Sequence, residues 1–199
     1  MDSSTPTTAG LERIAPVEPP YDAEVDAELG RWMPPGSPFE PLQVFRVLAR
    51  NLPLMQRMLP LGSGLLNHPS VSHRDRELII QRTCALAGAE AEWATHVFAF
   101  GKAVGITREQ TASLVFGGPA DACWTDERDR LVIELCDQLH ATATVTPDLR
   151  GRLAREFDDG QVVELLVIAG WYRTFSYVVN GAGVTPEEFV PRFTDFPLP

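Results

Sequence analysis

The sequence predicts an all-α protein, and three observations lead to this fold class. From about residue 41 onward, apolar residues recur every three or four positions, which is the spacing of one face of a helix. Ser, Thr and Asn at the start of these segments, and Gly at their ends, are typical helix caps. No segment shows the alternation of apolar and polar residues that a half-buried β-strand requires. With 199 residues, 44% of them hydrophobic, the chain is long enough for one packed core.

The two ends of the chain differ in composition from its centre. Residues 1–38 are expected to form an N-terminal tail, rich in Ser, Thr and Pro, that leads into a short helix over residues 21–33. Prolines and a glycine then separate this region from the main helical domain, which is expected over residues 39–184. Residues 185–199 are again Pro-rich and are expected to be a C-terminal tail that lies on the surface or against a partner.

The main domain is predicted to contain a succession of helices. The expected N-caps are Asn51, Ser72, Thr107 and Thr146, because their side-chain oxygens can accept a hydrogen bond from the first turn of a helix. The last helix is apolar nearly all round and is therefore expected to be buried on several sides. The expected helices cover residues 41–50, 51–66, 73–87, 90–103, 108–116, 125–141, 147–157 and 161–180.

One short sequence occurs twice in the main domain. The tripeptide Arg-Asp-Arg is found at residues 74–76 and again at residues 128–130, each time at the start of an apolar helical pattern. Two further helical patterns follow each copy. This weak internal repeat is consistent with a duplicated helical unit.

Charge and cysteine content restrict the partners and the compartment. A formal net charge of −10, without a cluster of basic residues, argues against a nucleic-acid partner. The 3 cysteines are widely spaced and form no CxxC pair, which favours a reducing cytoplasm over a disulfide framework. The N-terminus shows no secretory signal. No apolar stretch is expected to reach the roughly 20 residues that span a membrane, so a membrane is not an expected partner.

Titratable residues gather around a break of small residues, Ala-Gly-Ala, at positions 87–89. Glu92 and His96 are four residues apart and therefore share one face of the expected helix over residues 90–103. Glu77 lies on the preceding helix, about three turns before the break, so that a tight connection would bring it opposite His96. In an apolar setting such groups acquire shifted pKa values that suit general acid–base catalysis near neutral pH.

Two other interpretations of these three residues are open. A Glu–His pair on a helix is frequently a surface or capping interaction with no chemical role. Two carboxylates and one imidazole could also bind a metal ion inside a helical bundle. The second Glu-x-x-His sequence that a di-iron bundle requires is missing, so no metal is expected.

The stretch around this break resembles the carboxymuconolactone decarboxylase family, which also contains the alkyl hydroperoxidase D proteins. The family pattern is a helix that begins near a glutamate, a bend of small residues, and then E-W-x-x-H followed by small residues one helical turn apart. The matching positions here are Glu77, residues 87–89, Glu92, Trp93, His96, Gly101 and Gly105. Residues 163–184, with Gly-Trp-Tyr and a later Asn-x-x-Gly-Val, also resemble that family's C-terminal helix.

The resemblance implies an α-helical bundle of the alkyl hydroperoxidase D-like type that assembles into a ring, a trimer or hexamer, and uses no cofactor. Family members with peroxidase activity carry a CxxC in the bend region, and its two thiol positions fall on Ala89 and Glu92 of this chain. Neither residue can act as a thiolate nucleophile. CxxC-dependent peroxidase chemistry is therefore not expected.

The chain thus resembles the thiol-free branch of the family, which implies a cofactor-free decarboxylase, another lyase or an isomerase acting on a small carboxylated or carbonyl-containing metabolite. His96 is the expected proton shuttle, Glu77 its orienting partner and Glu92 a second acid–base group. The residues expected to bind the substrate are Arg82, Trp93, Tyr172 and Arg173. Either arginine could hold a substrate carboxylate, although Tyr172 and Arg173 could equally be core residues. The alternative is a non-catalytic, ring-forming scaffold or ligand-binding protein.

Overall fold

The computed structural model describes residues 13–196, and every regular element within them is helical. The all-α prediction is confirmed for the described residues. Residues 1–12 of the expected N-terminal tail and residues 197–199 of the expected C-terminal tail lie outside them. The α-helices are α1 (Ala23–Trp32), α2 (Gln43–Leu48), α3 (Leu52–Asn67), α4 (His73–Leu86), α5 (Glu90–His96), α6 (Arg108–Phe116), α7 (Glu127–Thr142), α8 (Pro147–Glu156) and α9 (Asp159–Ala182). Short 3₁₀ helices cover Ala49–Asn51 and Phe193–Asp195, and a π-helix covers Val97–Gly101.

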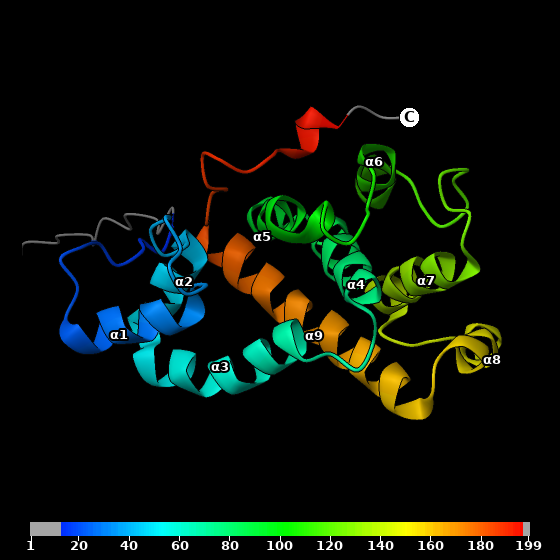
Figure 1. Cartoon of the computed structure of the whole chain (residues 1–199), viewed down its shortest axis with the longest axis horizontal. Coiled ribbons are helices and arrows are strands. Elements are labelled where there is room, and N and C mark those ends of the chain that lie inside the picture. Colours follow the sequence, from blue (N-terminus) through cyan, green and yellow to red (C-terminus); the bar gives the residue numbers. More distant parts are fainter. Residues whose placement is uncertain (1–12, 197–199) are drawn as a thin grey trace, which may run out of the picture.

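Helices α4 and α9 form the centre of the molecule (Figure 1). The 24-residue α9 runs diagonally through the middle, with α1, α2 and α3 on one side and α6, α7 and α8 on the other. Every residue of α4 from 75 to 84 is buried, although several of them are charged. Because a buried charge is costly unless it is paired, α4 is the element in which to look for a polar site.

Most helix starts lie where the sequence places them, because capping is a local interaction. The four expected N-cap side chains each accept a hydrogen bond from the first turn of their helix: Asn51, Ser72, Thr107 and Thr146. Two starts differ from the expectation. Helix α7 begins after Asp126, whose side chain caps it. Helix α9 begins two residues earlier than expected, because Asp158 forms a capping box with Gln161.

The helix expected over residues 90–103 is not continuous. Helix α5 ends at His96, and the π-helix Val97–Gly101 follows directly. A π-helix places one more residue in each hydrogen-bonded turn than an α-helix does, and therefore changes which side chains face the core. Gly101 is buried here, and a Cβ atom at this position would lie 3.7 Å from Nε2 of Gln81 in α4.

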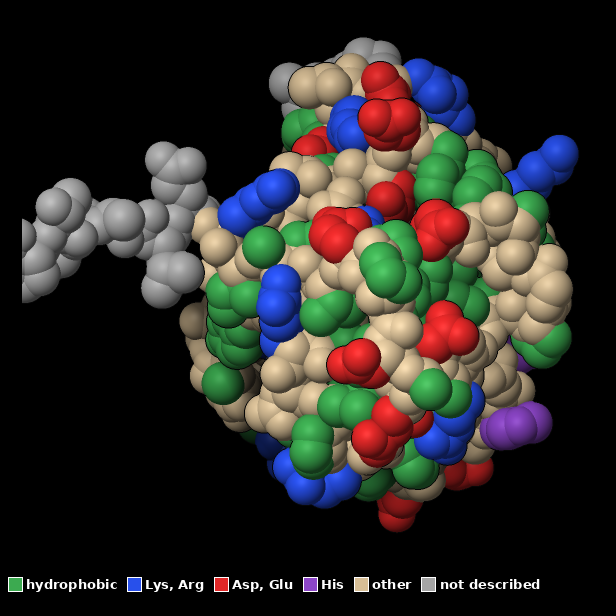
Figure 2. All heavy atoms as spheres, turned by 90° about the vertical axis from the view of Figure 1, so that its left-hand side faces the viewer, with side chains coloured by type: hydrophobic (Ala, Val, Ile, Leu, Met, Phe, Trp, Pro, Cys, Tyr) green, Lys and Arg blue, Asp and Glu red, His purple; other side chains and the backbone are tan. Residues whose placement is uncertain are grey.

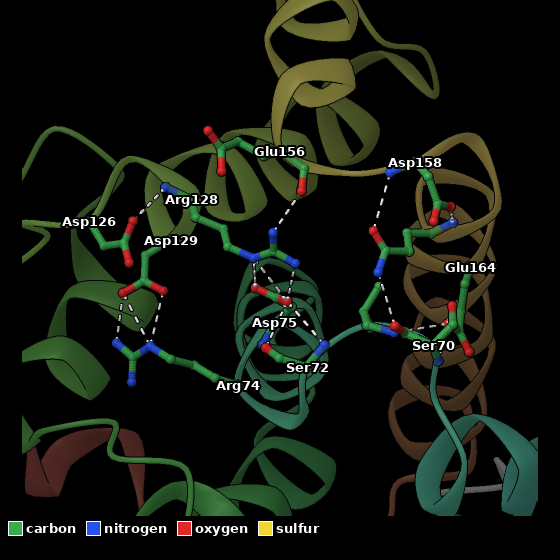
Figure 3. A network of polar contacts seen from close by, with 12 residues as sticks. Ser70, Ser72, Arg74, Asp75, Asp126, Arg128, Asp129, Glu156, Asp158 and Glu164 are labelled. Atoms are coloured by element: carbon green, nitrogen blue, oxygen red, sulfur yellow. Dashed lines mark hydrogen bonds and ion pairs between the residues drawn. The ribbon is translucent and has the colours of Figure 1, made fainter.

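The repeated tripeptide has a structural counterpart in two reciprocal ion pairs between α4 and α7 (Figure 3). Arg74 of α4 donates to Asp129 of α7 at 2.7 Å, and Arg128 of α7 donates to Asp75 of α4 at 2.9 Å. The N-cap residue of each helix lies two residues before its Arg-Asp-Arg copy. The two copies thus bind one another, as expected if α4 and α7 occupy equivalent positions in two related halves.

The residues after 184 lie back across α5 (Figure 1). The rings of Phe193 and Phe196 contact Trp93, with centroid distances of 4.6 and 5.5 Å. The backbone N–H of Phe193 donates to Glu90 at 2.6 Å. Near the other end of this segment, Glu187 accepts from the backbone N–H at the start of α2, at 2.7 Å. The expected C-terminal tail is therefore, as far as residue 196, a packed part of the domain.

Two surface features bear on the expected partners. Figure 2 shows the side that carries α1 and α2, where acidic side chains are scattered among apolar ones and most basic side chains lie nearer the rim.

Helix α9 is long and apolar enough, by length and composition alone, to cross a membrane, which corrects the expectation that no stretch reaches that length. A core helix of a soluble protein passes the same test, and Leu165, Ile168 and Phe175 of α9 are buried within this fold.

Candidate active site

A chain of four charged side chains runs through the interior between α4 and α5. Glu77 is fully buried, and its Oε1 accepts hydrogen bonds from Arg76 Nε and Nη2 at 3.0 and 2.8 Å. Its Oε2 lies 3.0 Å from Nδ1 of His96. On the other side of the imidazole, Nε2 lies 3.6 Å from Oε1 of Glu92. We call Arg76, Glu77, His96 and Glu92 the charge chain.

The connection between α4 and α5 brings these residues together. Gly88 has a φ of +64°, in the left-handed region where a glycine is favoured. The backbone N–H of Ala89 donates to the carbonyl of Cys84 at 2.9 Å, which closes the end of α4. The two helices pack against each other directly after the turn, so that Glu77 and His96 meet as the sequence predicts.

The pKa of His96 is about 9, above its ordinary value of 6.5. Burial is the largest influence and by itself lowers the pKa, because it disfavours the charged imidazolium. The charge and hydrogen bond of Glu77, together with those of Glu92, exceed this effect and raise the pKa. His96 is therefore a positively charged group at neutral pH, held between two carboxylates.

Aromatic side chains and one thiol surround the charge chain. The ring of Tyr172 in α9 meets His96 edge-on at 4.9 Å, and Phe100 lies at 5.3 Å. Burial, followed by the charge of Glu92, raises the pKa of the Cys84 thiol well above its usual value. Cys84 also receives a weak hydrogen bond from the Ser176 hydroxyl at 3.9 Å. This thiol is accordingly kept in its protonated, weakly nucleophilic form.

The charge chain reaches the surface through Glu92, beside a small hollow. The enclosed volume of this hollow is about 10 Å³, close to the room that one water molecule needs. His96 does not line the hollow and lies behind Glu92. The lining residues are Leu42, Val44, Ala91, Glu92, Thr95, Val184, Thr185 and Glu187. A wider surface hollow, of about 340 Å³, lies between the π-helix and α6 and contains no residue of the charge chain.

The other residues expected to bind substrate are only partly brought to this site. Tyr172 packs on His96, as described. Trp93 is fully buried under Phe193 and Phe196 and does not line the hollow.

The structure places both candidate arginines elsewhere. Arg82 donates to Asp137 at 2.6 Å and to the Leu114 carbonyl at 2.8 Å, so its guanidinium joins α4 to α7 and α6. Arg173 contacts His140 and Tyr177 on the outer side of α9. Neither lines the hollow beside Glu92.

Sequence reasoning missed Arg76 and Glu187. Neighbouring residues on a helix do not normally face each other, so the pairing of Arg76 with Glu77 has no signal in spacing. Glu187 belongs to a segment without periodicity, and only the course of the chain after α9 brings it beside Glu92. Within the described residues, no group of three or more His, Cys, Asp or Glu side chains is arranged to hold a metal ion.

No family model and no curated protein matches the chain. Among solved structures, an uncharacterized peroxidase-related protein from Silicibacter sp. TM1040 has a similar fold, with a TM-score of 0.64 and 17% sequence identity. The alignment covers 77% of this chain and 81% of that chain. The likeness supports the expected fold, a helical bundle of the alkyl hydroperoxidase D-like type. It does not extend to the carboxymuconolactone decarboxylase family in particular.

Proposed function

We propose that this protein is a cofactor-free acid–base enzyme that transfers a proton on a small carbonyl-containing molecule. The observation that carries the proposal is the charge chain, in which the buried imidazolium of His96 lies behind Glu92, a carboxylate that lines the surface hollow. Glu92 is the group placed to touch a substrate. Arg76, Glu77 and His96 are positioning residues that act through it.

The proposed step uses Glu92 as a general base and then as a general acid. Its carboxylate removes a proton from the carbon next to the carbonyl group. The electron pair of that C–H bond forms a C=C bond to the carbonyl carbon, and the π pair of the C=O bond moves onto the oxygen, which gives an enolate. The Glu92 carboxyl group exchanges its proton with solvent and then protonates the enolate, either at the original carbon or at another atom of the substrate. Protonation at another atom gives an isomerisation with no net change in redox state. The imidazole of His96, held by Glu77 at 3.0 Å, lies 3.6 Å from Glu92 and fixes the position of this carboxylate.

Decarboxylation is less well supported than isomerisation. Loss of CO₂ needs a cationic group to hold the substrate carboxylate, and the two arginines expected in that role, Arg82 and Arg173, make other contacts. CxxC-dependent peroxidase chemistry has no support here, because Ala89 and Glu92 occupy the thiol positions. The term "peroxidase-related" describes the protein of similar fold, not this chain.

Hydrogen exchange tests the proposal without knowledge of the natural substrate. A panel of small ketones and lactones is incubated with the protein in D₂O, and NMR follows deuterium entering the carbon next to the carbonyl. The wild-type protein is expected to accelerate exchange for at least one compound. Glu92→Gln should lower that rate at least about 100-fold, since it removes the base.

Glu188→Gln is the matched control, because Glu188 is exposed and does not line the hollow. It should exchange at the wild-type rate. Equal exchange by wild type and Glu92→Gln would refute the acid–base role. No exchange with any compound would favour the alternative, a non-catalytic ligand-binding or scaffold protein.

A further inference from the structure

We infer that the wider hollow, between the π-helix and α6, binds a small organic anion that carries a hydrogen-bonding group at its other end. This hollow is separate from the one beside Glu92, so the inference does not rest on the proposed function. Three observations carry it: the size and charge of the hollow, the helix start that opens onto it, and a buried amide without a partner behind it.

The hollow is large enough for a small metabolite, and its charged side chains are positive. Its volume of about 340 Å³ lies within the range of small-molecule sites, roughly 300–1,000 Å³. Lys102 and Arg108 line it, and none of its lining residues is acidic. The net charge of the chain is −10, so the hollow is opposite in sign to the chain as a whole. A local concentration of positive charge attracts an anion to this place.

Both cationic side chains have N–H donors to spare. Lys102 is exposed, and within the described residues its ammonium group takes part in no ion pair. Arg108 is exposed as well, and it donates to the backbone carbonyl of Asp195 while its guanidinium lies 4.8 Å from the centre of the Phe196 ring. A guanidinium has five N–H groups, so this contact leaves donors for a ligand.

The first turn of α6 opens at the same hollow, since Thr107 and Arg108 both line it. The capping box pairs the backbone N–H groups of Thr107 and Gln110. Those of Arg108 and Glu109 have no acceptor within the described part of the chain, as is usual for the first turn of a helix. These N–H groups and the helix dipole favour a negative charge beside the two cations.

A buried amide without a hydrogen-bond partner lies behind the hollow. Gln81 of α4 is 0% exposed, and among the described residues neither its Nε2 nor its Oε1 has a partner. Its Nε2 faces Gly101, which lines the hollow: a Cβ atom at position 101 would lie 3.7 Å from this nitrogen. Apart from adjacent residues and the backbone of its own helix, no other described atom would lie within 4 Å of that Cβ. The missing side chain of Gly101 thus leaves space between the amide and the hollow.

These three features define the ligand from its outer to its inner end. Its negative charge lies between Lys102, Arg108 and the first turn of α6, where a carboxylate or a phosphate ester is equally suited. Its apolar body packs on Val97, Ile106 and Phe196. At the inner end a hydroxyl or carbonyl group meets Gln81, whose amide both donates and accepts and is costly while it has no partner.

Lys102 is the single lysine of the chain, which supplies a specific reporter for the test. Reductive methylation with ¹³C-formaldehyde labels this side chain and the N-terminal amine and keeps their positive charge. NMR of the labelled protein at pH 7 follows the methyl signals during titration with benzoate, phenyl phosphate, benzyl alcohol and benzylamine. The Lys102→Gln variant, which lacks the lysine signal, assigns it.

Benzoate and phenyl phosphate are each expected to shift the Lys102 signal and to bind about tenfold more tightly than benzyl alcohol, and benzylamine should bind most weakly. Inorganic phosphate, which has the charge without the apolar body, should bind more weakly than phenyl phosphate. The tighter of the two organic anions then identifies the charged group that the hollow prefers. Benzylamine that binds as tightly as both anions would refute the inference.

Gln81→Met tests the inner end, because it keeps the length of the side chain and removes the amide. In the wild-type protein para-hydroxybenzoate should bind about threefold more tightly than benzoate, since its hydroxyl group reaches Gln81. The variant should bind both compounds equally. If the wild type shows no such preference, or the variant keeps it, Gln81 does not contact the ligand and the inference is wrong.

Lys102→Gln tests the outer end, with binding followed by the backbone signals of Ile106 and Thr111. It should weaken benzoate about three- to tenfold and leave benzyl alcohol unchanged. Arg57→Gln is the matched control, because Arg57 is exposed on α3 and its loss removes the same charge away from the hollow. An equal effect of the two variants would mean that benzoate responds to the net charge alone. Binding is measured without turnover and with Glu92 intact, so this outcome is independent of the exchange experiment.

Discussion

At the scale of single residues, His96 is a group whose charge state depends on the fold. Transfer from water into the core would lower the pKa of a lone imidazole, yet Glu77 and Glu92 together raise it to about 9. Glu77 and Glu92 are in turn stabilised by the positive charges of Arg76 and His96, because a buried charge without a partner of opposite sign would destabilise the fold. Protonation of His96 and stability of the fold are thus linked.

The linkage predicts a specific dependence of stability on pH. The folded pKa of about 9 exceeds the unfolded value of 6.5, so His96 stabilises the fold fully below pH 6.5, and this contribution is lost as pH rises to about 9. The difference corresponds to about 3 kcal/mol. Urea unfolding at pH 6, 7.5 and 9 measures it, and His96→Gln should remove most of this dependence.

His140→Gln is the control for this measurement. Burial and then the charge of Arg173 lower the pKa of His140, so its titration falls below the same pH interval. The variant should keep the wild-type loss of stability between pH 6.5 and 9. A wild-type protein that is equally stable at pH 6.5 and 9 would show that His96 is neutral in the fold.

At the scale of elements, the pairing of α4 with α7 organises the buried side of the molecule. Arg74 and Arg128 are about 30% exposed, while their partners Asp129 and Asp75 are nearly buried. Such pairs are less screened by water than ordinary surface pairs. Their reciprocal arrangement fixes the position of α4 along α7. It thereby also fixes the position along α5 at which Glu77 contacts His96.

A double-mutant cycle on Arg74→Ala and Asp129→Ala should therefore give a coupling free energy of about 1–2 kcal/mol. The pair of Arg152 with Asp148, whose carboxylate is 82% exposed and lies 3.7 Å away, serves as the comparison and should couple by less than about 0.5 kcal/mol. Chemical unfolding of the four proteins in each cycle supplies the values. Equal coupling in the two cycles would mean that the α4–α7 pairs do not hold the helices in register.

The sequence predicts what is decided locally. The caps at Ser72 and Thr107 and the alignment of Glu92 with His96 depend on neighbours a few residues away, and all three are found as expected. The π-helix after His96 has no such signal, because it depends on how the segment packs on α4. The partner of a buried arginine cannot be predicted locally either: Arg82 donates to Asp137, 55 residues later in the sequence.

At the scale of the whole molecule, the segment after α9 covers a buried tryptophan and forms one side of the candidate site. It covers Trp93 with Phe193 and Phe196, and it brings Glu187 to the hollow. A Pro-rich composition gave no reason to expect a packed segment, because the contacts are with α2 and α5 rather than within the segment itself.

Phe193→Ala should expose part of Trp93, shift tryptophan emission to longer wavelength and lower the free energy of unfolding by about 1–3 kcal/mol. Phe116→Ala, at a side chain that is 43% exposed, should change stability by less than about 1 kcal/mol and leave the emission unchanged. In a Trp93→Phe background the shift caused by Phe193→Ala should vanish. Emission that does not respond to Phe193→Ala would contradict the packing described here.

The position of this segment also has a consequence during translation. Residues 184–196 leave the ribosome after every helix from α1 to α9. Arg76, Glu77, His96 and Glu92 can therefore come together before the segment that carries Glu187 has been synthesised. Until this segment arrives, Glu92 and Trp93 are without the side chains that cover them in the folded protein. A nascent chain that stalls before residue 187 would therefore expose an incomplete site.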